Sequence, residues 1–248
     1  MSFVQHKRDW EALGTMDPFW AVASHPQYRF GRWDVDALFQ TGERVIGEVM
    51  ESAARLGYPA GRESALDFGC GVGRLTRALA THFSRCYGVD ISVNMIEQAK
   101  ALNRQHGGCE FLVIQEDYLG IFADNSFDLV VSFRVLQHLP SADLIRKYVA
   151  DLLDVLRPDG LLVFQQLSYI PPRKRLQLRR RLYRALQHLG FRERFLYERL
   201  KLTPIRLQYI PEAEMKAYLA AIGATLLEVQ LDRAADPTIA SRTYFVRK

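Results

Sequence analysis

Short apolar segments that alternate with helical patterns constrain the fold of this chain more than any other feature. The segments span residues 65–68, 86–89, 110–114, 127–133 and 161–166, and several intervals between them carry apolar residues at helical spacing. Strands that alternate with helices in this way form a parallel sheet that helices cover on both faces. In such a sheet, ligands bind at the carboxyl ends of the strands.

Two further helices are predicted from capping residues and apolar spacing. Asp34 and Thr41 are suitable N-caps for a helix whose apolar face extends over residues 45–56. Ser141 begins a second helix, which the turn at 157–160 is expected to end. The first helix precedes the sheet, and the second connects two of its strands.

The C-terminal part departs from the alternation. A helix over 211–222 is followed by the strand-like runs 225–231 and 243–247, with only a polar loop between them. Two strands that are joined without a helix pair in the antiparallel direction. We therefore expect an antiparallel hairpin at one edge of the sheet.

Composition limits the class of protein. The 248 residues are 48% hydrophobic and 25% charged, which is typical of a globular chain and excludes a disordered or fibrous one. The sequence shows neither an apolar run long enough to span a bilayer nor a secretory signal, so a cytoplasmic location is expected. Cys70, Cys86 and Cys109 have no metal-binding spacing, so neither a metal site nor a disulfide framework is predicted.

Positive charge is concentrated in residues 170–206, an insertion that contains twelve Lys and Arg but only two Glu, in a chain of net charge +5. One predicted helical face carries Leu178, Leu182, Ala185, Leu186 and Leu189, with arginines opposite. The segment is either a cap that recruits an anionic acceptor, RNA or an anionic membrane surface, or a packed helix with a solvated basic face. Nucleic acid is less favoured, because the arginines are not interleaved with aromatic residues for base stacking.

Residues 1–60 are interpreted as an N-terminal aromatic arm and helix that precede the domain at 61–248. The arm either covers the sheet or closes over the ligands as a lid. In the lid interpretation, the residues expected to contact substrate are Trp20, Tyr28, Arg32 and Trp33.

A glycine-rich turn follows the first strand. Gly69, Gly71 and Gly73 leave the backbone accessible where the strand turns into a helix, so main-chain amides could hold a pyrophosphate or a carboxylate. A dinucleotide fingerprint requires a small residue at position 74. Position 74 is arginine, so this fingerprint does not fit.

The turn resembles the Asp/Glu-x-Gly-x-Gly-x-Gly motif of class I S-adenosylmethionine-dependent methyltransferases, read here from Asp67 to Gly73. Asp90 follows 23 residues after Asp67, at the end of the second strand, and Asp117 follows the third. The stretches 126–131 and 136–139 resemble the family's fourth strand and the loop beyond it. The resemblance implies a Rossmann-like, doubly wound, mostly parallel seven-stranded α/β sheet with an antiparallel C-terminal hairpin, an N-terminal helical arm and a helical insertion after strand five.

The resemblance also implies S-adenosyl-L-methionine as cofactor. Asp90 would accept bonds from the ribose hydroxyls, and the glycine turn would contact the methionine end. The full set of expected cofactor-binding residues is Asp67, Gly69, Cys70, Gly71, Gly73, Arg74, Asp90, Ile91, Met95, Asp117, Tyr118, Phe133 and Arg134. His138 is the candidate catalytic base, or else a structural histidine of the same loop.

The predicted function is transfer of a methyl group to an oxygen or nitrogen atom of a small acceptor, such as an anionic, natural-product or glycan-like molecule. Two alternatives are an NAD(P)-dependent oxidoreductase and a non-catalytic scaffold that binds nucleic acid or membrane. The oxidoreductase would need a small residue in place of Arg74.

Overall fold

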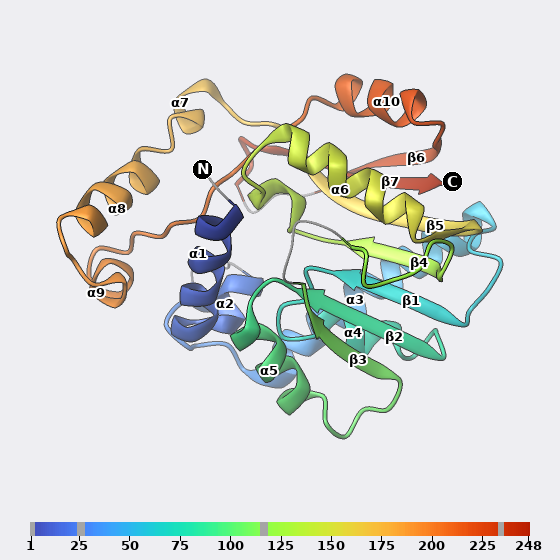
Figure 1. The fold of residues 1–248 in the computed structure, drawn as a ribbon, viewed down its shortest axis with the longest axis horizontal. Coiled ribbons are helices and arrows are strands. Elements are labelled where there is room, and N and C mark those ends of the chain that lie inside the picture. The colour runs from blue at the N-terminus through green and yellow to red at the C-terminus, as the bar shows by residue number, and fades with distance from the viewer. Residues whose placement is uncertain (1–2, 24–27, 115–118, 233–235) are drawn as a thin grey trace.

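The computed structural model of the chain describes residues 3–23, 28–114, 119–232 and 236–248, which fold around one seven-stranded sheet (Figure 1). The strand order is β3-β2-β1-β4-β5-β7-β6. The first five strands are parallel, and β7 pairs antiparallel with both β5 and β6. The strands are β1 (Ser64–Phe68), β2 (Arg85–Asp90), β3 (Cys109–Val113), β4 (Phe127–Ser132), β5 (Leu156–Tyr169), β6 (Thr225–Asp232) and β7 (Ala240–Arg247). The predicted fold class is confirmed.

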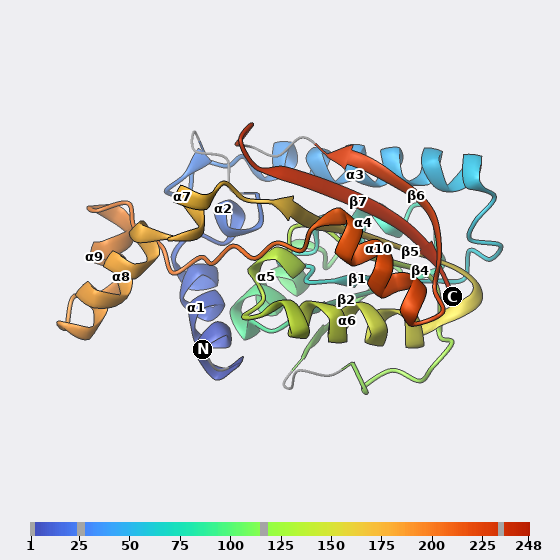
Figure 2. The ribbon, with the colours of Figure 1, turned by 90° about the horizontal axis from the view of Figure 1, so that it is seen from above.

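Helices cover both faces of the sheet, as Figure 2 shows edge-on. One face packs against α3 (Val35–Leu56) and α4 (Arg74–Leu79), and the other against α6 (Ala142–Asp154) and α10 (Glu212–Ala221). The central strands β1 and β4 are buried along their whole length, because helices exclude water from both of their faces. Asp34 caps α3 and Ser141 caps α6, as predicted.

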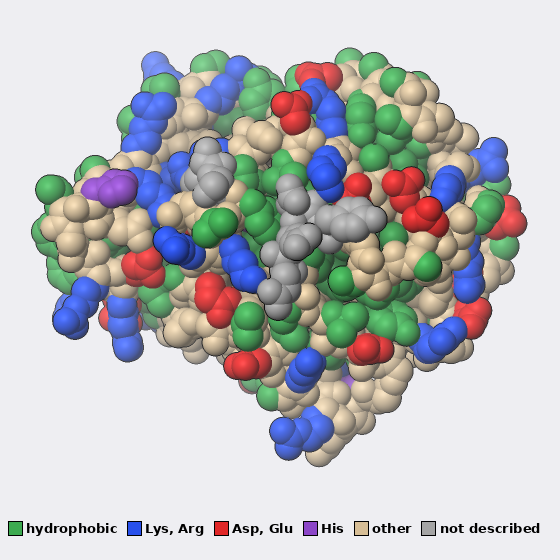
Figure 3. Space-filling view, in the orientation of Figure 1, with side chains coloured by type: hydrophobic (Ala, Val, Ile, Leu, Met, Phe, Trp, Pro, Cys, Tyr) green, Lys and Arg blue, Asp and Glu red, His purple; other side chains and the backbone are tan. Residues whose placement is uncertain are grey.

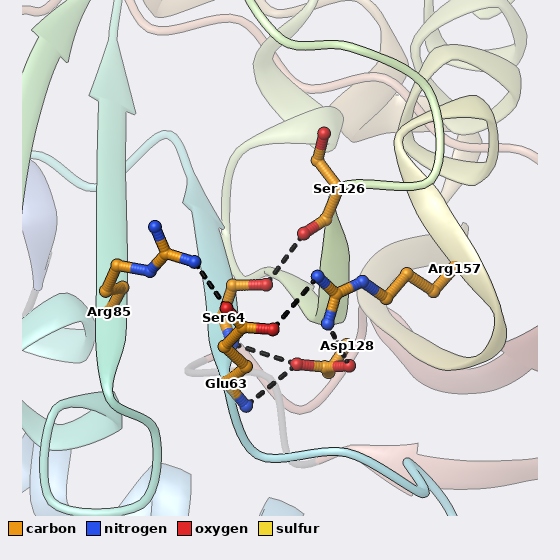
Figure 4. Close-up of polar contacts among 6 residues, drawn as sticks. All are labelled: Glu63, Ser64, Arg85, Ser126, Asp128 and Arg157. Carbon is orange, nitrogen blue, oxygen red and sulfur yellow. Dashed lines mark hydrogen bonds and ion pairs between the residues drawn. The ribbon is translucent and has the colours of Figure 1, made fainter.

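Residues 157–160 do not form the predicted turn. They belong to β5, which begins at Leu156, because Arg157 is held at the amino edge of the sheet (Figure 4). There Arg157 Nη1 donates to Asp128 Oδ1 at 2.8 Å, and Asp128 Oδ2 accepts from the backbone amides of Glu63 and Ser64 at 2.9 Å each. This network fastens the ends of β1, β4 and β5 on the side opposite the strands' carboxyl ends.

The N-terminal arm contains two helices that the aromatic pattern did not predict, α1 (Phe3–Met16) and α2 (Pro18–Val22). The insertion after β5 forms α7 (Pro172–Arg175), α8 (Leu178–His188) and α9 (Glu193–Glu198), which project from the sheet beside α1 (Figure 1). The remaining helical elements are α5 (Val93–Leu102) and a short 3₁₀ turn at Leu136–His138. Among the residues described, no helix combines the length and the apolar character that crossing a bilayer requires.

Two glycines of α3 offer a matched test of how closely the arm helix packs on the domain. A Cβ atom on Gly42 would lie 2.4 Å from the backbone oxygen of Arg74, whereas a Cβ on Gly47 would meet no atom within 4 Å. We expect Gly42→Ala to lower the free energy of unfolding by roughly 1–3 kcal/mol through overpacking. Gly47→Ala should instead raise it by up to about 1 kcal/mol through helix propensity. Urea denaturation measures both values, and equal effects would contradict the close approach of α3 and α4.

Candidate active site

A cavity lies at the carboxyl ends of β1, β2 and β4, with about 810 Å³ of empty space counted out to its solvent opening. Its lining combines apolar side chains with a few charged ones, as ligand sites do. The predicted cofactor-binding residues that line it are Asp67, Gly69, Cys70, Gly71, Arg74, Asp90, Ile91, Met95, Phe133 and Arg134, and His138 lines it as well. The sheet topology thus brings residues from three separate segments of the sequence to one place.

The glycine turn contributes space more than hydrogen-bond donors. The amides of Gly69 and Cys70 both donate to the carbonyl of Val89, at 2.8 and 2.9 Å, and so are not available to a ligand. A Cβ on Gly69 would lie 2.2 Å from Val135 Cγ2, and both Gly69 and Gly71 have positive φ. The Val89 carbonyl of β2 thus engages the amides of Gly69 and Cys70, and contact of the turn with the methionine end stays a prediction.

Asp90 is positioned to bind two hydroxyl groups. Its Oδ2 accepts from the amide of Gly71 at 3.0 Å, and its Oδ1 accepts from the amide of Ser92 at 2.9 Å. Each carboxylate oxygen retains a second lone pair. Burial raises the pKa of Asp90, although the two amide bonds act in the opposite direction. We expect the two remaining lone pairs to accept from hydroxyl groups of a ligand, as the sequence predicts for a ribose.

Asp67 and Arg74 form the buried polar floor of the cavity. Asp67 is 1% exposed and accepts from Thr76 Oγ1 at 2.7 Å. Burial raises the pKa of Asp67 to about 6, against the hydrogen bond from Thr76 and the charge of Arg74. Arg74 is 6% exposed; it donates to Thr41 Oγ1 at 3.1 Å, while its Nε is buried without a partner. Burial, reinforced by the charge of Arg134, lowers the pKa of Arg74 to about 10.

A second cavity adjoins the first and shares three of its wall residues, Arg74, Phe133 and Arg134. It lies on the α3 side of the sheet, between that helix and the carboxyl end of β5, where Gln165 accepts from the amide of Arg134 at 3.0 Å. Its lining includes Arg44 in addition to the shared arginines. Positive charge therefore dominates the boundary between the two cavities.

His138 lines only the first cavity, and the protein engages both of its ring nitrogens. Nδ1 lies 2.8 Å from the backbone carbonyl of Arg206, so Nδ1 carries the proton. Nε2 lies 3.2 Å from the side-chain nitrogen Nε2 of Gln137. Burial lowers the pKa of His138 to about 4, and the charge of Arg134 lowers it further, although the Arg206 carbonyl acts in the opposite direction. The imidazole is therefore neutral at physiological pH.

Helix α1 supplies cavity residues that the sequence analysis missed. Phe3, His6 and Trp10 recur every three or four residues and line the first cavity from above. The Trp10 ring lies 5.2 Å from the His138 ring, and His6 lies 6.3 Å from Trp10. Burial and the charges near His138 and Arg206 lower the pKa of His6 to about 3. Their helical spacing was the available signal, which the irregular aromatics farther along the arm obscured.

The predicted substrate-contact residues have different locations. Trp33 lines the second cavity, and Tyr28 stacks on it with ring centroids 3.8 Å apart. Trp20 is buried against Tyr197 of α9, and Arg32 is exposed. None of Trp20, Tyr28 and Arg32 is among the described residues that line either cavity.

The remaining predicted cofactor residues lie elsewhere. Gly73 is not in the cavity wall; a Cβ there would lie 2.6 Å from the Phe111 ring, so this glycine permits packing of the turn. The predicted residues Asp117 and Tyr118 lie outside the described residues.

The arm and the insertion are joined by a buried carboxylate. Asp17 is 1% exposed and accepts from Tyr197 Oη at 2.6 Å and from the amide of Phe30 at 2.5 Å. Arg29 lies over the Tyr197 ring, 4.4 Å from its centroid. Arg184 of α8 pairs with Asp9 of α1. The N-terminal arm and the insertion after β5 are therefore held together as one unit beside the first cavity.

Comparison with known proteins agrees with this geometry. Residues 66–164 match the sequence model of a family described as a methyltransferase domain. The chain is 31% identical over 121 residues to a probable methyltransferase of Aspergillus luteorubrus, an alignment that covers 45% of this chain and 42% of that protein. It is 28% identical to the ubiquinone biosynthesis O-methyltransferase of Escherichia coli, over 66% of this chain and 64% of that protein. The chain thus spans about half the length of these relatives.

Solved structures show the same fold. The magnesium protoporphyrin IX methyltransferase of Synechocystis, crystallised with bound S-adenosylhomocysteine, superimposes with a TM-score of 0.65 at 18% identity and covers 100% of both chains. Residues 66–164 therefore resemble a methyltransferase domain, and the chain has the fold of class I methyltransferases. The cofactor predicted from the sequence is that of this family.

The geometry of Asp90 predicts its effect on cofactor binding. We expect Asp90→Ala to weaken binding of S-adenosylhomocysteine by about 1–3 kcal/mol, because two hydroxyls would lose a buried acceptor. Isothermal titration calorimetry measures the dissociation constant. Asp124→Ala removes an exposed carboxylate in the loop before β4 and should leave it unchanged. Equal affinities for the wild type and Asp90→Ala would remove Asp90 from the site.

The lowered pKa values of His6 and His138 predict a loss of stability in acid. Both lie below the ordinary value of 6.5, so the unfolded chain binds protons between about pH 6.5 and 4 that the folded chain does not. Stability attributable to these histidines is complete above that range and is lost as the pH falls through it. Asp67, whose pKa is raised, acts in the opposite direction.

We therefore expect the double variant His6→Asn/His138→Asn to lose less free energy of unfolding than the wild type between about pH 7 and about pH 5. Urea titrations at the two pH values measure the difference. His188→Asn, at an exposed position of α8, should follow the wild type. An identical loss in the double variant and the wild type would contradict the assignment of buried neutral histidines.

Proposed function

We propose that this chain transfers a methyl group from S-adenosylmethionine to an oxygen atom of a small anionic acceptor. The observation that carries the proposal is the wall of Arg74, Phe133 and Arg134, which two adjoining cavities share. A donor in the first cavity and an acceptor in the second would lie on either side of these three residues, so the transfer requires their side chains to leave a passage between the cavities. Methyl transfer is an in-line displacement, and its rate depends more on the alignment of the acceptor atom with the methyl group than on catalytic groups of the protein.

The residues of the first cavity fit the cofactor. The lone pairs that Asp90 retains suit a ribose diol, and Ile91 and Met95 supply apolar walls for a purine. Gly69 and Gly71 allow Val135 and Val22 to pack against the turn, because a Cβ at either glycine would lie within 2.4 Å of a valine methyl group. Arg74, with its buried unpartnered Nε, is the cation for the carboxylate of the methionine end. The bound cofactor supplies a methyl group on a sulfonium.

The residues of the second cavity favour an anionic acceptor. Arg134 is the cation of its wall that is left for the acceptor, because Arg74 is assigned to the cofactor and Arg44 lies 4.0 Å from Glu48. Asp232 is a further carboxylate of the lining. Trp33, backed by Tyr28, offers an aromatic face for the body of the acceptor. Cations close to an acceptor hydroxyl also favour its ionised, nucleophilic form. Oxygen as the methylated atom agrees with the O-methyltransferases among the relatives.

His138 is proposed as a positioning residue. Its two ring nitrogens are engaged by Arg206 and Gln137, and a group whose pKa is lowered to about 4 is a weak base at neutral pH. Its hydrogen bond to the Arg206 carbonyl holds the segment after α9 against the loop that follows β4. The predicted role as catalytic base stays a prediction that the pH dependence of turnover can decide.

Turnover with small phenolic acceptors tests the function. We expect S-adenosylhomocysteine to form with phenolic carboxylates, and the KM for them to rise by about tenfold in Arg134→Gln, which loses one charge-assisted hydrogen bond. Methyl esters of the same phenols should be poorer substrates whose KM does not respond to Arg134→Gln. Arg104→Gln, at an exposed position after α5, is the matched control. Equal KM values for the esters and the free acids, with no change in Arg134→Gln, would refute the proposal that the acceptor is anionic. Absence of product with every acceptor, despite cofactor binding, would contradict the transfer itself.

A further inference from the structure

Helix α8 has its apolar face turned away from the protein. Leu178, Leu182 and Leu189 lie on one side of the helix and are 65%, 51% and 75% exposed. A helix on a globular domain normally buries such a stripe. These three leucines of the predicted apolar face meet solvent. Leu186, predicted on the same face, is instead partly buried against the cluster of Tyr183, Leu196 and Leu202.

Polar contacts fix this orientation from the inner side of α8. Arg180 Nε donates to the carbonyl of Pro204 at 3.0 Å, and Arg184 donates to Gln187 Oε1 at 2.8 Å in addition to its pair with Asp9. Tyr183, on the same side, is 1% exposed. The inner stripe therefore carries arginines in specific contacts, and rotating the helix to bury its leucines would break all of them.

The exposed apolar stripe continues onto the neighbouring segments. Phe191 and Phe195 are each 44% exposed, and their rings stack with centroids 5.8 Å apart. We define the outer apolar surface as Leu176, Leu178, Leu182, Leu189, Phe191, Phe195 and Leu200, all of them exposed. In a monomeric soluble protein, contiguous apolar patches of this kind mark interaction sites.

Basic residues surround the outer apolar surface. Arg173, Arg181, Arg192 and Arg199 are exposed, and none forms an ion pair with another residue that the structure describes. Figure 3 shows green side chains bordered by blue ones at the end of the molecule where α8 and α9 lie. The basic residues of the segment at 170–206 therefore include Arg180 and Arg184, which fix the helix, and these four arginines, which face solvent.

We propose that the outer apolar surface and its arginines bind the surface of an anionic phospholipid bilayer. Charge complementarity selects this occupant, because exposed guanidinium groups attract anionic headgroups. The leucines and phenylalanines between them would enter the boundary between headgroups and acyl chains. A nucleic acid would use the charges but would leave the aliphatic side chains in water. A second copy of this basic surface would repel the first.

Sedimentation with lipid vesicles tests the proposal without cofactor or acceptor, so its outcome does not depend on the proposed methyl transfer. The chain should sediment with vesicles of phosphatidylcholine and phosphatidylglycerol, far less with phosphatidylcholine alone, and less as ionic strength rises. Leu178→Ser/Leu182→Ser should weaken binding by about tenfold or more, since two apolar side chains would no longer enter the bilayer. Arg181→Glu/Arg192→Glu should weaken it to a similar extent.

Matched controls lie outside the segment. Ile222→Ser changes an apolar residue, 39% exposed, after α10, and Arg104→Glu reverses an exposed charge after α5; both should bind as the wild type does. Absence of vesicle binding by the wild type would overturn the proposal, as would equal binding of neutral and anionic vesicles. Unchanged binding by the leucine pair, together with tight binding to duplex RNA, would assign the surface to nucleic acid. Self-association in sedimentation velocity that the leucine pair abolishes would assign it to a second copy.

Discussion

The turn between β1 and α4 can exist only where side chains are absent, and the arrangement of the site depends on this constraint. Gly69 approaches Val135 and Gly71 approaches Val22 more closely than any Cβ would allow. The turn amides bond to Val89 and Asp90, which ties the ends of β1 and β2 together. The same bonds that shape the cavity therefore orient the carboxylate that faces it.

The cover of the cavity is built from segments far apart in sequence. Asp17 connects the arm to Tyr197 of the insertion, and Tyr197 packs in the same apolar cluster as Val72 and Met95 of the cavity region. The N-terminal arm, the insertion and the glycine turn are thus connected by direct packing contacts. A surface that docks on a bilayer through α8 would hold the entrance of the active site close to the membrane, where an amphipathic anionic acceptor would be concentrated.

Buried charge distinguishes this site from a simple apolar pocket. Arg74 lies almost fully buried with one donor unpartnered, at the boundary of two cavities. An uncompensated buried cation is costly unless a ligand completes its environment. Burial lowers the pKa of His6 and His138 and keeps both neutral, with smaller contributions from nearby arginines, so the cation available to an anionic ligand is arginine and not histidine.

The sequence by itself determined the sheet, its order of elements and the ligand-binding edge, because apolar alternation, Asp34, Ser141 and the glycine turn act through local geometry. It also grouped Asp67, Asp90 and Arg74 correctly at the first cavity. Only the tertiary structure decided that Phe3, His6 and Trp10 face the cavity, that the Gly69 amide is already bonded, and that the leucines of α8 point outward. These outcomes depend on which distant surface each element packs against, and helical or strand periodicity identifies a face without identifying its partner.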